Sequence, residues 1–179
     1  MPEGLLRIEA FTFSGCTSLK KIDILDSLTC IEENAFENCT GFTKLNFTKN
    51  LVTLRLNAFT GCNGLKKISI LSTLEDFSVC AFSSCPNLQV YEVAENHPNY
   101  SLFEGILYNK DRTELLRCPN GKKGEVIIPS GVTELSATSF RNCDKITNVT
   151  IPDSVTKILP FTFDNCSSLK EIYIPDSVT

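Results

Sequence analysis

The stretch Ile31–Phe47, IEENAFENCTGFTKLNF, sets the organisation of the whole chain. It places a Phe three residues before a Cys, and apolar residues three, six and eight positions after that Cys. The spacing recurs with a period of 23 residues on both sides of one gap. The cysteines in this register are Cys16, Cys39, Cys62, Cys85, Cys143 and Cys166, and the phenylalanines are Phe13, Phe36, Phe59, Phe82, Phe140 and Phe163. A fixed period of this length predicts a solenoid, in which each copy forms one coil and contacts only its neighbours.

The apolar positions after each Cys form three columns through the predicted stack. In the first copy they are Leu19, Ile22 and Ile24. The last two are two residues apart, so their side chains point to one face of a strand. Stacked coils then pair these strands into a parallel β-sheet, with a spacing of about 4.8 Å.

The segment before each Cys predicts a short helix on the other side of the coil. Its last residue is Gly or Asn in most copies, as at Asn38 and Gly61, and these residues tolerate a left-handed helix cap. Pro160 fits the first turn of such a helix, where a missing N–H costs nothing. The expected fold class is therefore an α/β solenoid of the leucine-rich-repeat type, with a parallel β-sheet on its concave face and short helices or turns opposite.

One irregular coil interrupts the register. Cys85 and Cys143 are 58 residues apart, so a coil of about 35 residues replaces a standard one. Within it, Ile106–Tyr108 and Leu115–Leu116 flank a polar turn and predict a hairpin. We expect a single solenoid domain over residues 1–179, with regular coils at 5–93 and 132–179 and the irregular coil at about 94–131. The two ends of the chain fall at a similar phase of the repeat, and no atypical capping repeat is visible at either. This favours the interpretation that the chain is part of a longer array.

The pattern IPDSVTKI…F.NCSSLKEIYIP, over residues 151–175, resembles that of the BspA-like leucine-rich repeats. The resemblance covers nearly all of the chain except about residues 94–124. It implies a right-handed superhelix and a non-enzymatic protein-binding module. Such repeats occur in surface proteins of bacteria and parasitic protists, so the resemblance implies a cell-surface or secreted, adhesin-like protein that binds host or extracellular-matrix proteins.

Composition excludes some functions and leaves the compartment open. The net charge of −4 gives no electrostatic case for nucleic acid. No apolar run approaches the roughly 20 residues that membrane insertion needs. No signal peptide is visible, and this favours an alternative, a cytosolic scaffold for protein–protein interaction.

The nine cysteines do not suggest a disulfide framework. Six lie in one column with parallel Cβ vectors, which suit a disulfide poorly, so we expect reduced thiols in the core. No metal site or cofactor is expected, because there is no CxxC motif and His97 is the only histidine. Cys30 shares its column with Arg7 and Asp76 and is expected at the surface, as a reactive thiol or a tolerated Cys. We also expect His97 to be a surface residue, and no catalytic constellation is present.

Polar residues between the apolar strand positions predict an outward-facing binding surface. Five lysines of the first three coils form a basic ridge, and later positions add polar side chains. The candidate partner-binding residues are Lys20, Lys21, Lys44, Lys66, Lys67, Asn46, Glu92 and Tyr173. They favour a recognition face for an acidic or polar protein partner. The alternative interpretation is a solvated rim.

The two ends of the stack should expose apolar side chains. The first coil presents Leu5, Ile8 and Phe13, and the last presents Phe163 and Ile172. Unpaired strand edges invite pairing with another chain, so end-to-end self-association is a further expectation. The alternative is that residues 1–4 and 174–179 fold over the ends as lids.

Overall fold

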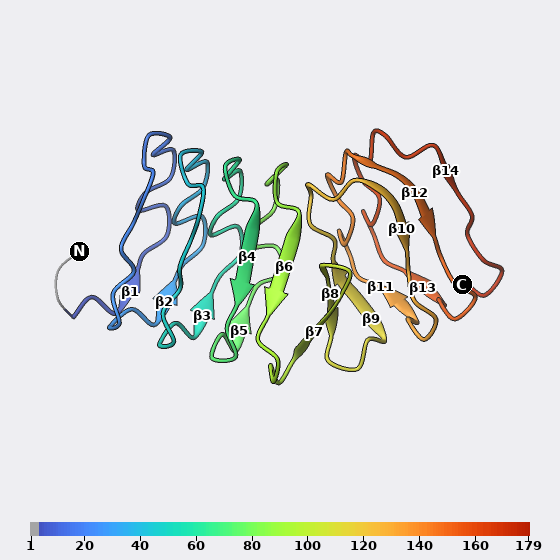
Figure 1. The fold of residues 1–179 in the computed structure, drawn as a ribbon, viewed down its shortest axis with the longest axis horizontal. Coiled ribbons are helices and arrows are strands. Elements are labelled where there is room, and N and C mark those ends of the chain that lie inside the picture. Colours follow the sequence, from blue (N-terminus) through green and yellow to red (C-terminus); the bar gives the residue numbers. More distant parts are fainter. Residues whose placement is uncertain (1–3) are drawn as a thin grey trace.

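The computed structural model describes residues 4–179 as an elongated stack of coils (Figure 1). The described residues form 14 β-strands and no helix. Each regular coil has a short-strand side, a turn side that carries the Phe and Cys, and a long-strand side. We call residues 5–93 the N-terminal block, 94–131 the bridging coil and 132–179 the C-terminal block.

The strands form four sheets, and most neighbouring strands are parallel. On the short-strand side of the N-terminal block they are β1 (Arg7–Ile8), β2 (Cys30–Ile31), β3 (Thr53–Leu54) and β5 (Asp76–Phe77). On its long-strand side they are β4 (Lys67–Ile70) and β6 (Val90–Val93). The bridging coil contains β7 (Tyr100–Phe103), β8 (Ile106–Asn109), β9 (Glu114–Arg117) and β10 (Gly124–Ile127). The C-terminal block contains β11 (Glu134–Leu135), β12 (Ile146–Thr150), β13 (Lys157–Ile158) and β14 (Glu171–Ile172).

The repeated phenylalanines form a ladder through the N-terminal block. The ring of Phe36 stacks on Phe13 at 5.0 Å and on Phe59 at 4.9 Å, and Phe59 stacks on Phe82 at 5.4 Å. Phe36 and Phe59 are completely buried, in one hydrophobic cluster with the buried cysteines of the same coils. The predicted columns are therefore the core of this block.

The predicted helices are wrong, because the turn side pairs between coils rather than within them. Phe36 N donates to Ala58 O at 2.8 Å, and Asn38 N donates to Thr60 O at 2.8 Å. An α-helix would need these N–H groups for carbonyls four residues earlier in the same segment. The predicted left-handed positions are nevertheless confirmed, since Asn38 has φ 56° and Gly61 has φ 70°.

The predicted long-strand sheet is only partly formed. Pairing on this side is confined to β4 with β6 and to β10 with β12 and β14. The segments 20–24 and 43–47 of the first two coils are not strands. Their apolar residues, such as Ile22 and Leu45, still pack against the core but stay partly exposed.

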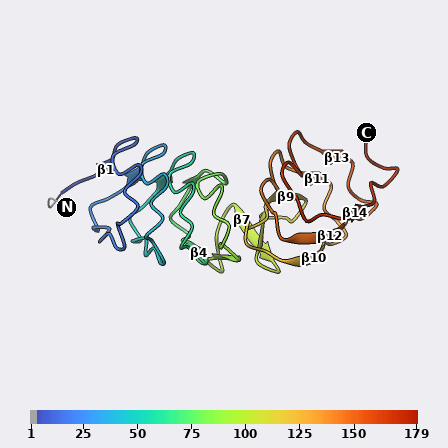
Figure 2. The ribbon, with the colours of Figure 1, turned by 90° about the horizontal axis from the view of Figure 1, so that it is seen from above.

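The bridging coil forms a wall between two hydrophobic cores (Figures 1 and 2). The predicted hairpin is confirmed by the antiparallel pairing of β8 with β9, and β7 adds an antiparallel strand that was not predicted. Successive side chains of a strand point to opposite faces. Accordingly, Leu107 belongs to the core of the N-terminal block, whereas Ile106 and Tyr108 belong to that of the C-terminal block.

Two glycines let the bridging coil lie close against the N-terminal block. Gly105 accepts a hydrogen bond from Tyr91 N, and a Cβ at Gly105 would lie 2.8 Å from Val90 Cγ2. Gly121 donates to Leu88 O at 2.6 Å, and a Cβ there would lie 2.7 Å from backbone atoms of Asn87 and Leu88. A larger residue at 121 would have to displace the main chain.

Cys118 takes the position of the missing Phe in the bridging coil. Its N donates to Ser139 O at 2.7 Å, as Phe59 N donates to Ala81 O in a regular coil. Cys118 is fully buried. The ladder resumes only at Phe140, whose ring stacks on Phe163 at 5.2 Å. Cys118 therefore lies in the phenylalanine column of the stack and not in the cysteine column.

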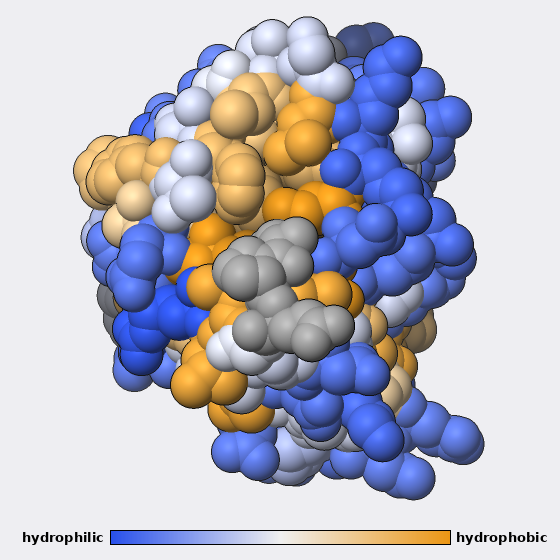
Figure 3. Space-filling view, turned by 90° about the vertical axis from the view of Figure 1, so that its left-hand side faces the viewer, coloured by the Kyte–Doolittle hydropathy of each residue, from blue (hydrophilic) through white to orange (hydrophobic). Residues whose placement is uncertain are grey.

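The end faces differ from each other. At the N-terminal end, Leu5, Ile8, Phe13, Leu19 and Ile22 line an apolar hollow of about 580 Å³, and Figure 3 shows hydrophobic side chains gathered there. At the other end, residues 175–179 continue the stack, since Ser177 Oγ donates to Val155 O at 2.7 Å and Val178 packs on the core. The predicted lid at residues 1–4 lies almost entirely outside the described residues. End-to-end association stays a prediction.

Candidate binding surface

The long-strand side of the N-terminal block carries most of the predicted site residues. In β4, Ile68 and Ile70 are buried, while Lys67 and Ser69 are exposed. The parallel register places Ser69 beside Glu92 of β6. The alternation of an exposed and a buried side chain thus presents Lys67 and Glu92 to solvent.

The predicted basic ridge is partly neutralised. Lys67 Nζ lies 2.9 Å from Glu92 Oε1, and Ser69 Oγ donates to Glu92 Oε2 at 2.8 Å. The hydrogen bond from Lys67, followed by that from Ser69, holds the pKa of Glu92 below its usual value. Lys21 Nζ lies 2.6 Å from Asp23 Oδ1. The ridge is therefore a mixed-charge surface.

The remaining ridge residues lie on the same side but outside regular strands. Lys20, Lys44, Lys66 and Asn46 are all exposed. Within residues 4–179, none of these three lysines has a carboxylate partner within 4.0 Å. They supply the free positive charge of the ridge, and its role in recognition stays a prediction.

Tyr173 belongs to a separate surface. It follows β14, is 67% exposed and borders a hollow of about 530 Å³ over β12 and β14. The bridging coil lies between this hollow and the ridge (Figure 1). The structure therefore does not bring Tyr173 together with the other predicted residues.

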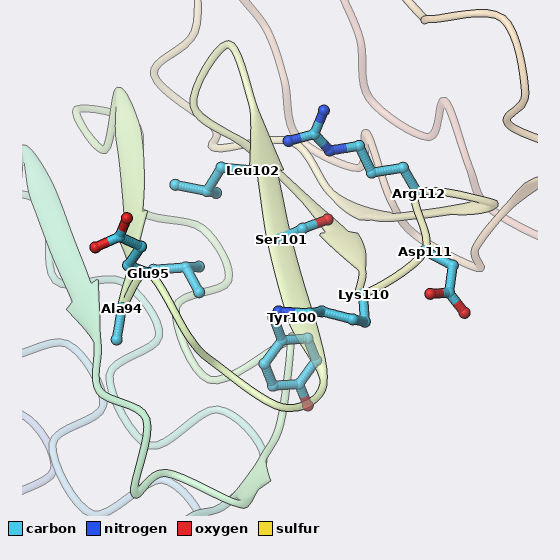
Figure 4. A pocket seen from close by; sticks show the side chains of 9 residues that line it. Ala94, Glu95, Tyr100, Ser101, Leu102, Lys110, Asp111 and Arg112 are labelled. Atoms are coloured by element: carbon cyan, nitrogen blue, oxygen red, sulfur yellow. The ribbon is translucent and has the colours of Figure 1, made fainter.

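A cleft that the sequence did not reveal opens where β6 meets the bridging coil. It has a volume of about 440 Å³ and is lined by Val93–Glu95, Tyr100–Leu102 and Lys110–Arg112. Figure 4 shows Glu95 and Leu102 beside the same space, with Lys110, Asp111 and Arg112 on the connection that follows β8. The lining carries both signs of charge.

The walls of this cleft are held by specific contacts. Tyr100 donates through its hydroxyl to Phe77 O at 3.3 Å, and its ring lies 4.8 Å from that of His97. Lys110 Nζ donates to His97 O at 2.8 Å. Tyr100–Phe103, with the sequence YSLF, contains two aromatic residues, which favour strands, and this was the available signal for β7 and hence for the cleft.

His97 is not the surface residue that was predicted. It is 0% exposed, and its ring packs against that of Tyr100. Its Nδ1 accepts from Asn99 N at 3.1 Å. Burial is the largest cause that lowers the pKa of His97. This histidine therefore has a packing role.

The cysteines also depart from expectation in part. All nine, which lie within the described residues, are free thiols. Cys39, Cys62, Cys85 and Cys143 are buried as predicted, whereas Cys16 is exposed because no coil covers it. Cys30 is only 7% exposed, so its predicted surface position is wrong. Burial and a hydrogen bond to Glu32 raise the pKa of Cys30 to about 11.

The described residues contain no cluster of three or more His, Cys, Asp or Glu side chains that could hold a metal ion. Nor do residues 4–179 include an apolar helix of membrane-spanning length.

Comparison with known proteins identifies the repeat. The model of a family described as the BspA type leucine-rich repeat region matches six copies, over residues 1–105 and 120–179. No curated protein sequence matches the chain.

Solved bacterial structures share the fold. The pneumococcal vaccine antigen PcpA is 25% identical with a TM-score of 0.81, over 90% of this chain and 40% of that one. A leucine-rich cell surface protein from Faecalibacterium prausnitzii is 25% identical with a TM-score of 0.80, over 100% of this chain and 54% of that one. A leucine-rich repeat protein from Eubacterium ventriosum is 24% identical with a TM-score of 0.84, over 99% of this chain and 54% of that one. The chain thus spans about half of these structures or less.

Proposed function

Because the chain belongs to the BspA-type leucine-rich repeat family, we propose that it is a non-enzymatic protein-binding module of a cell-surface or secreted protein. Its partner would be a host or extracellular-matrix protein. Among the structural relatives are a vaccine antigen and a cell surface protein, which supports this location. A right-handed superhelix with the long strands on its concave face is part of the proposal.

The observation that carries the proposal is the cleft beside β6. Along the N-terminal block the long-strand side repeats one coil after another, and the bridging coil then closes this surface with a wall of different chemistry. An extended polypeptide lying along the ridge would place its end against Glu95, Lys110 and Arg112. The mixed charges suit a polar partner, since charge complementarity gives specificity and speeds association.

A cytosolic scaffold is the second candidate. It is favoured by the nine free cysteines, because disulfides are rare in the cytosol and thiols persist there. Such a scaffold would use the same surface for a different partner. No nucleic acid or inserted membrane segment enters either proposal.

Charge reversal on the ridge tests the recognition face. Lys21, Lys44 and Lys67 changed together to Glu should abolish binding in a pull-down from matrix and host-cell extracts. Stability should change by less than about 0.5 kcal/mol per site, as is usual for surface positions. Glu9→Lys, Glu33→Lys and Glu75→Lys, three exposed positions on another side of the stack, form the matched control. Unchanged binding by the ridge variant, with loss in an Arg112→Glu variant, would place recognition in the cleft instead.

A further inference from the structure

The turn side of the stack is interrupted where the bridging coil crosses it. In regular coils the turns lie at the surface and bond to one another, as when Gly61 N donates to Ser83 O at 3.0 Å. In the bridging coil this segment runs inside the protein, with Arg117 at 1% and Asn120 at 1% exposure. The turns of the two flanking blocks therefore meet above it, and Asn142 Nδ2 donates to Ser84 Oγ at 3.1 Å.

A pocket of about 470 Å³ lies at this junction. Turn residues of both blocks line it, and the buried Arg117 contributes to its wall. Most of the lining side chains are polar, including Asn57, Ser84 and Asn142. The volume falls within the usual range for small-ligand sites, about 300–1,000 Å³.

Arg117 has an incomplete set of partners. Its Nη1 donates to Thr138 O at 2.5 Å, whereas the buried Nη2 has no hydrogen-bond partner. Within residues 4–179, no carboxylate lies within ion-pairing distance of it. Buried charges are normally paired, so this guanidinium calls for a counter-ion. Anion binding then requires the guanidinium to turn toward the pocket, and Thr138 is the only described residue whose hydrogen bonds to the guanidinium oppose this turn.

We propose that this pocket binds a sugar acid through a carboxylate–guanidinium pair with Arg117. The planar guanidinium donates two parallel hydrogen bonds to a carboxylate, which gives a directional and strong contact. The site goes beyond the proposed protein-binding function, because it lies on the turn side rather than on the long-strand side.

The other lining groups favour a hydroxylated monoanion. Arg141 is already paired with Asp164 at 2.9 Å, so Arg117 supplies the one uncompensated positive charge. Glu37 also lines the pocket, and its repulsion grows with the charge of the ligand, so a monoanion is favoured over a multiply charged anion. The same carboxylate can accept a hydrogen bond from a sugar hydroxyl. Leu56, 45% exposed, offers an apolar contact to the carbon skeleton.

Thermal unfolding with sodium glucuronate as the probe tests the proposal. Glucuronate should raise the melting temperature in a saturable way, and glucose should not. Sodium acetate at equal ionic strength should need at least a tenfold higher concentration for the same shift. An equal response to acetate would overturn the sugar assignment. No response to any of them would overturn the site, and would mean that the charge is compensated inside the protein.

Two variants separate binding from folding. Arg117→Met should abolish the glucuronate response without lowering the melting temperature of the ligand-free protein, because it removes an unpaired buried charge. If glucuronate raised the melting temperature of this variant as much as that of the parent, the proposal would be overturned. Should this variant fail to fold, Leu56→Glu places a like charge at the pocket and should weaken the response at least tenfold. Val52→Glu, at a similarly exposed residue of the same coil outside the pocket, is the matched control. Equal responses from Leu56→Glu and Val52→Glu would also overturn the proposal.

Discussion

The N-terminal and C-terminal blocks are built from the same repeat, yet their cores differ. The N-terminal block stacks four phenylalanine rings between Phe13 and Phe82, whereas the C-terminal block stacks only Phe140 on Phe163. Within the described residues, every buried polar or charged side chain lies at or beyond His97. The interruption of the repeat places His97, Arg117 and Asn120 inside the bridging coil, and the C-terminal block adds three small hydroxyl side chains, those of Ser136, Ser139 and Thr162.

The difference follows from how a solenoid satisfies its backbone. Each regular coil offers its neighbour the same donors and acceptors in the same places. The one repeated side chain that completes them in the core is the Cys thiol, as when Cys62 Sγ donates to Phe36 O at 3.3 Å. At the bridging coil this match fails. Asn120 there bridges the blocks, because its Oδ1 accepts from Cys85 N at 3.2 Å and its Nδ2 donates to Arg141 O at 2.6 Å.

The largest expected effect is the loss of a ring from the middle of the longer ladder. Phe59→Ala removes a fully buried ring that contacts Phe36 and Phe82, and should lower the free energy of unfolding by about 3–5 kcal/mol. Phe163→Ala removes a partly exposed ring at the end of the short ladder and should cost less than half as much. Chemical denaturation of both variants measures the contrast.

Equal losses from Phe59→Ala and Phe163→Ala would contradict this difference between the blocks. Phe11→Ala serves as the control, because Phe11 is 60% exposed and outside the ladder. The free energy of unfolding of this variant should remain within about 0.5 kcal/mol of that of the parent, as is usual for surface changes.

Much of this architecture was predictable, because periodicity reports burial directly. The Phe and Cys columns and the left-handed positions followed from residue spacing and from the preference of Gly and Asn for positive φ. The helix prediction failed because the local pattern does not reveal that Phe36 N donates to the next coil. Whether this N–H bonds within its own segment or to the next coil depends on stacking between residues far apart in sequence, and no single segment encodes that stacking.

The candidate sites were harder to predict for the same reason. The exposed position of Lys67 follows from strand alternation in β4. The ion pairs that Lys21 and Lys67 form, and the burial of Cys30, depend on side chains that become neighbours only in the folded stack. Both the cleft at Tyr100 and the pocket at Arg117 arise where the repeat stops, and here periodicity gives no information.

An intermediate effect is expected from removing the amide that joins the blocks. Asn120→Ala leaves the buried Cys85 N–H without its acceptor and should cost about 1–3 kcal/mol. Because this contact links the two cores, unfolding should also separate into two transitions in a calorimetric scan. Asn87→Ala is the matched control, since Asn87 also donates to a backbone carbonyl, that of Asn63, but is exposed. A single transition, with the same loss as in Asn87→Ala, would refute the bridging role of Asn120.

The smallest perturbation is a probe that leaves the fold intact, namely alkylation of the native thiols by iodoacetamide. Alkylation requires an exposed thiolate, so Cys16, which is exposed at the uncovered end, should react first. Cys30 should react slowly at neutral pH, and faster as the pH approaches its raised pKa of about 11.

The same experiment compares two buried thiols. Cys62 lies within the regular ladder and Cys85 beside the bridging coil, and burial raises the pKa of both thiols. Mass spectrometry over time should find them equally protected, because Asn120 and Gly121 close the junction as tightly as a regular coil would. Labelling of Cys85 at a rate near that of Cys16 would instead show that the blocks separate in solution, and Cys62 provides the internal standard for that comparison.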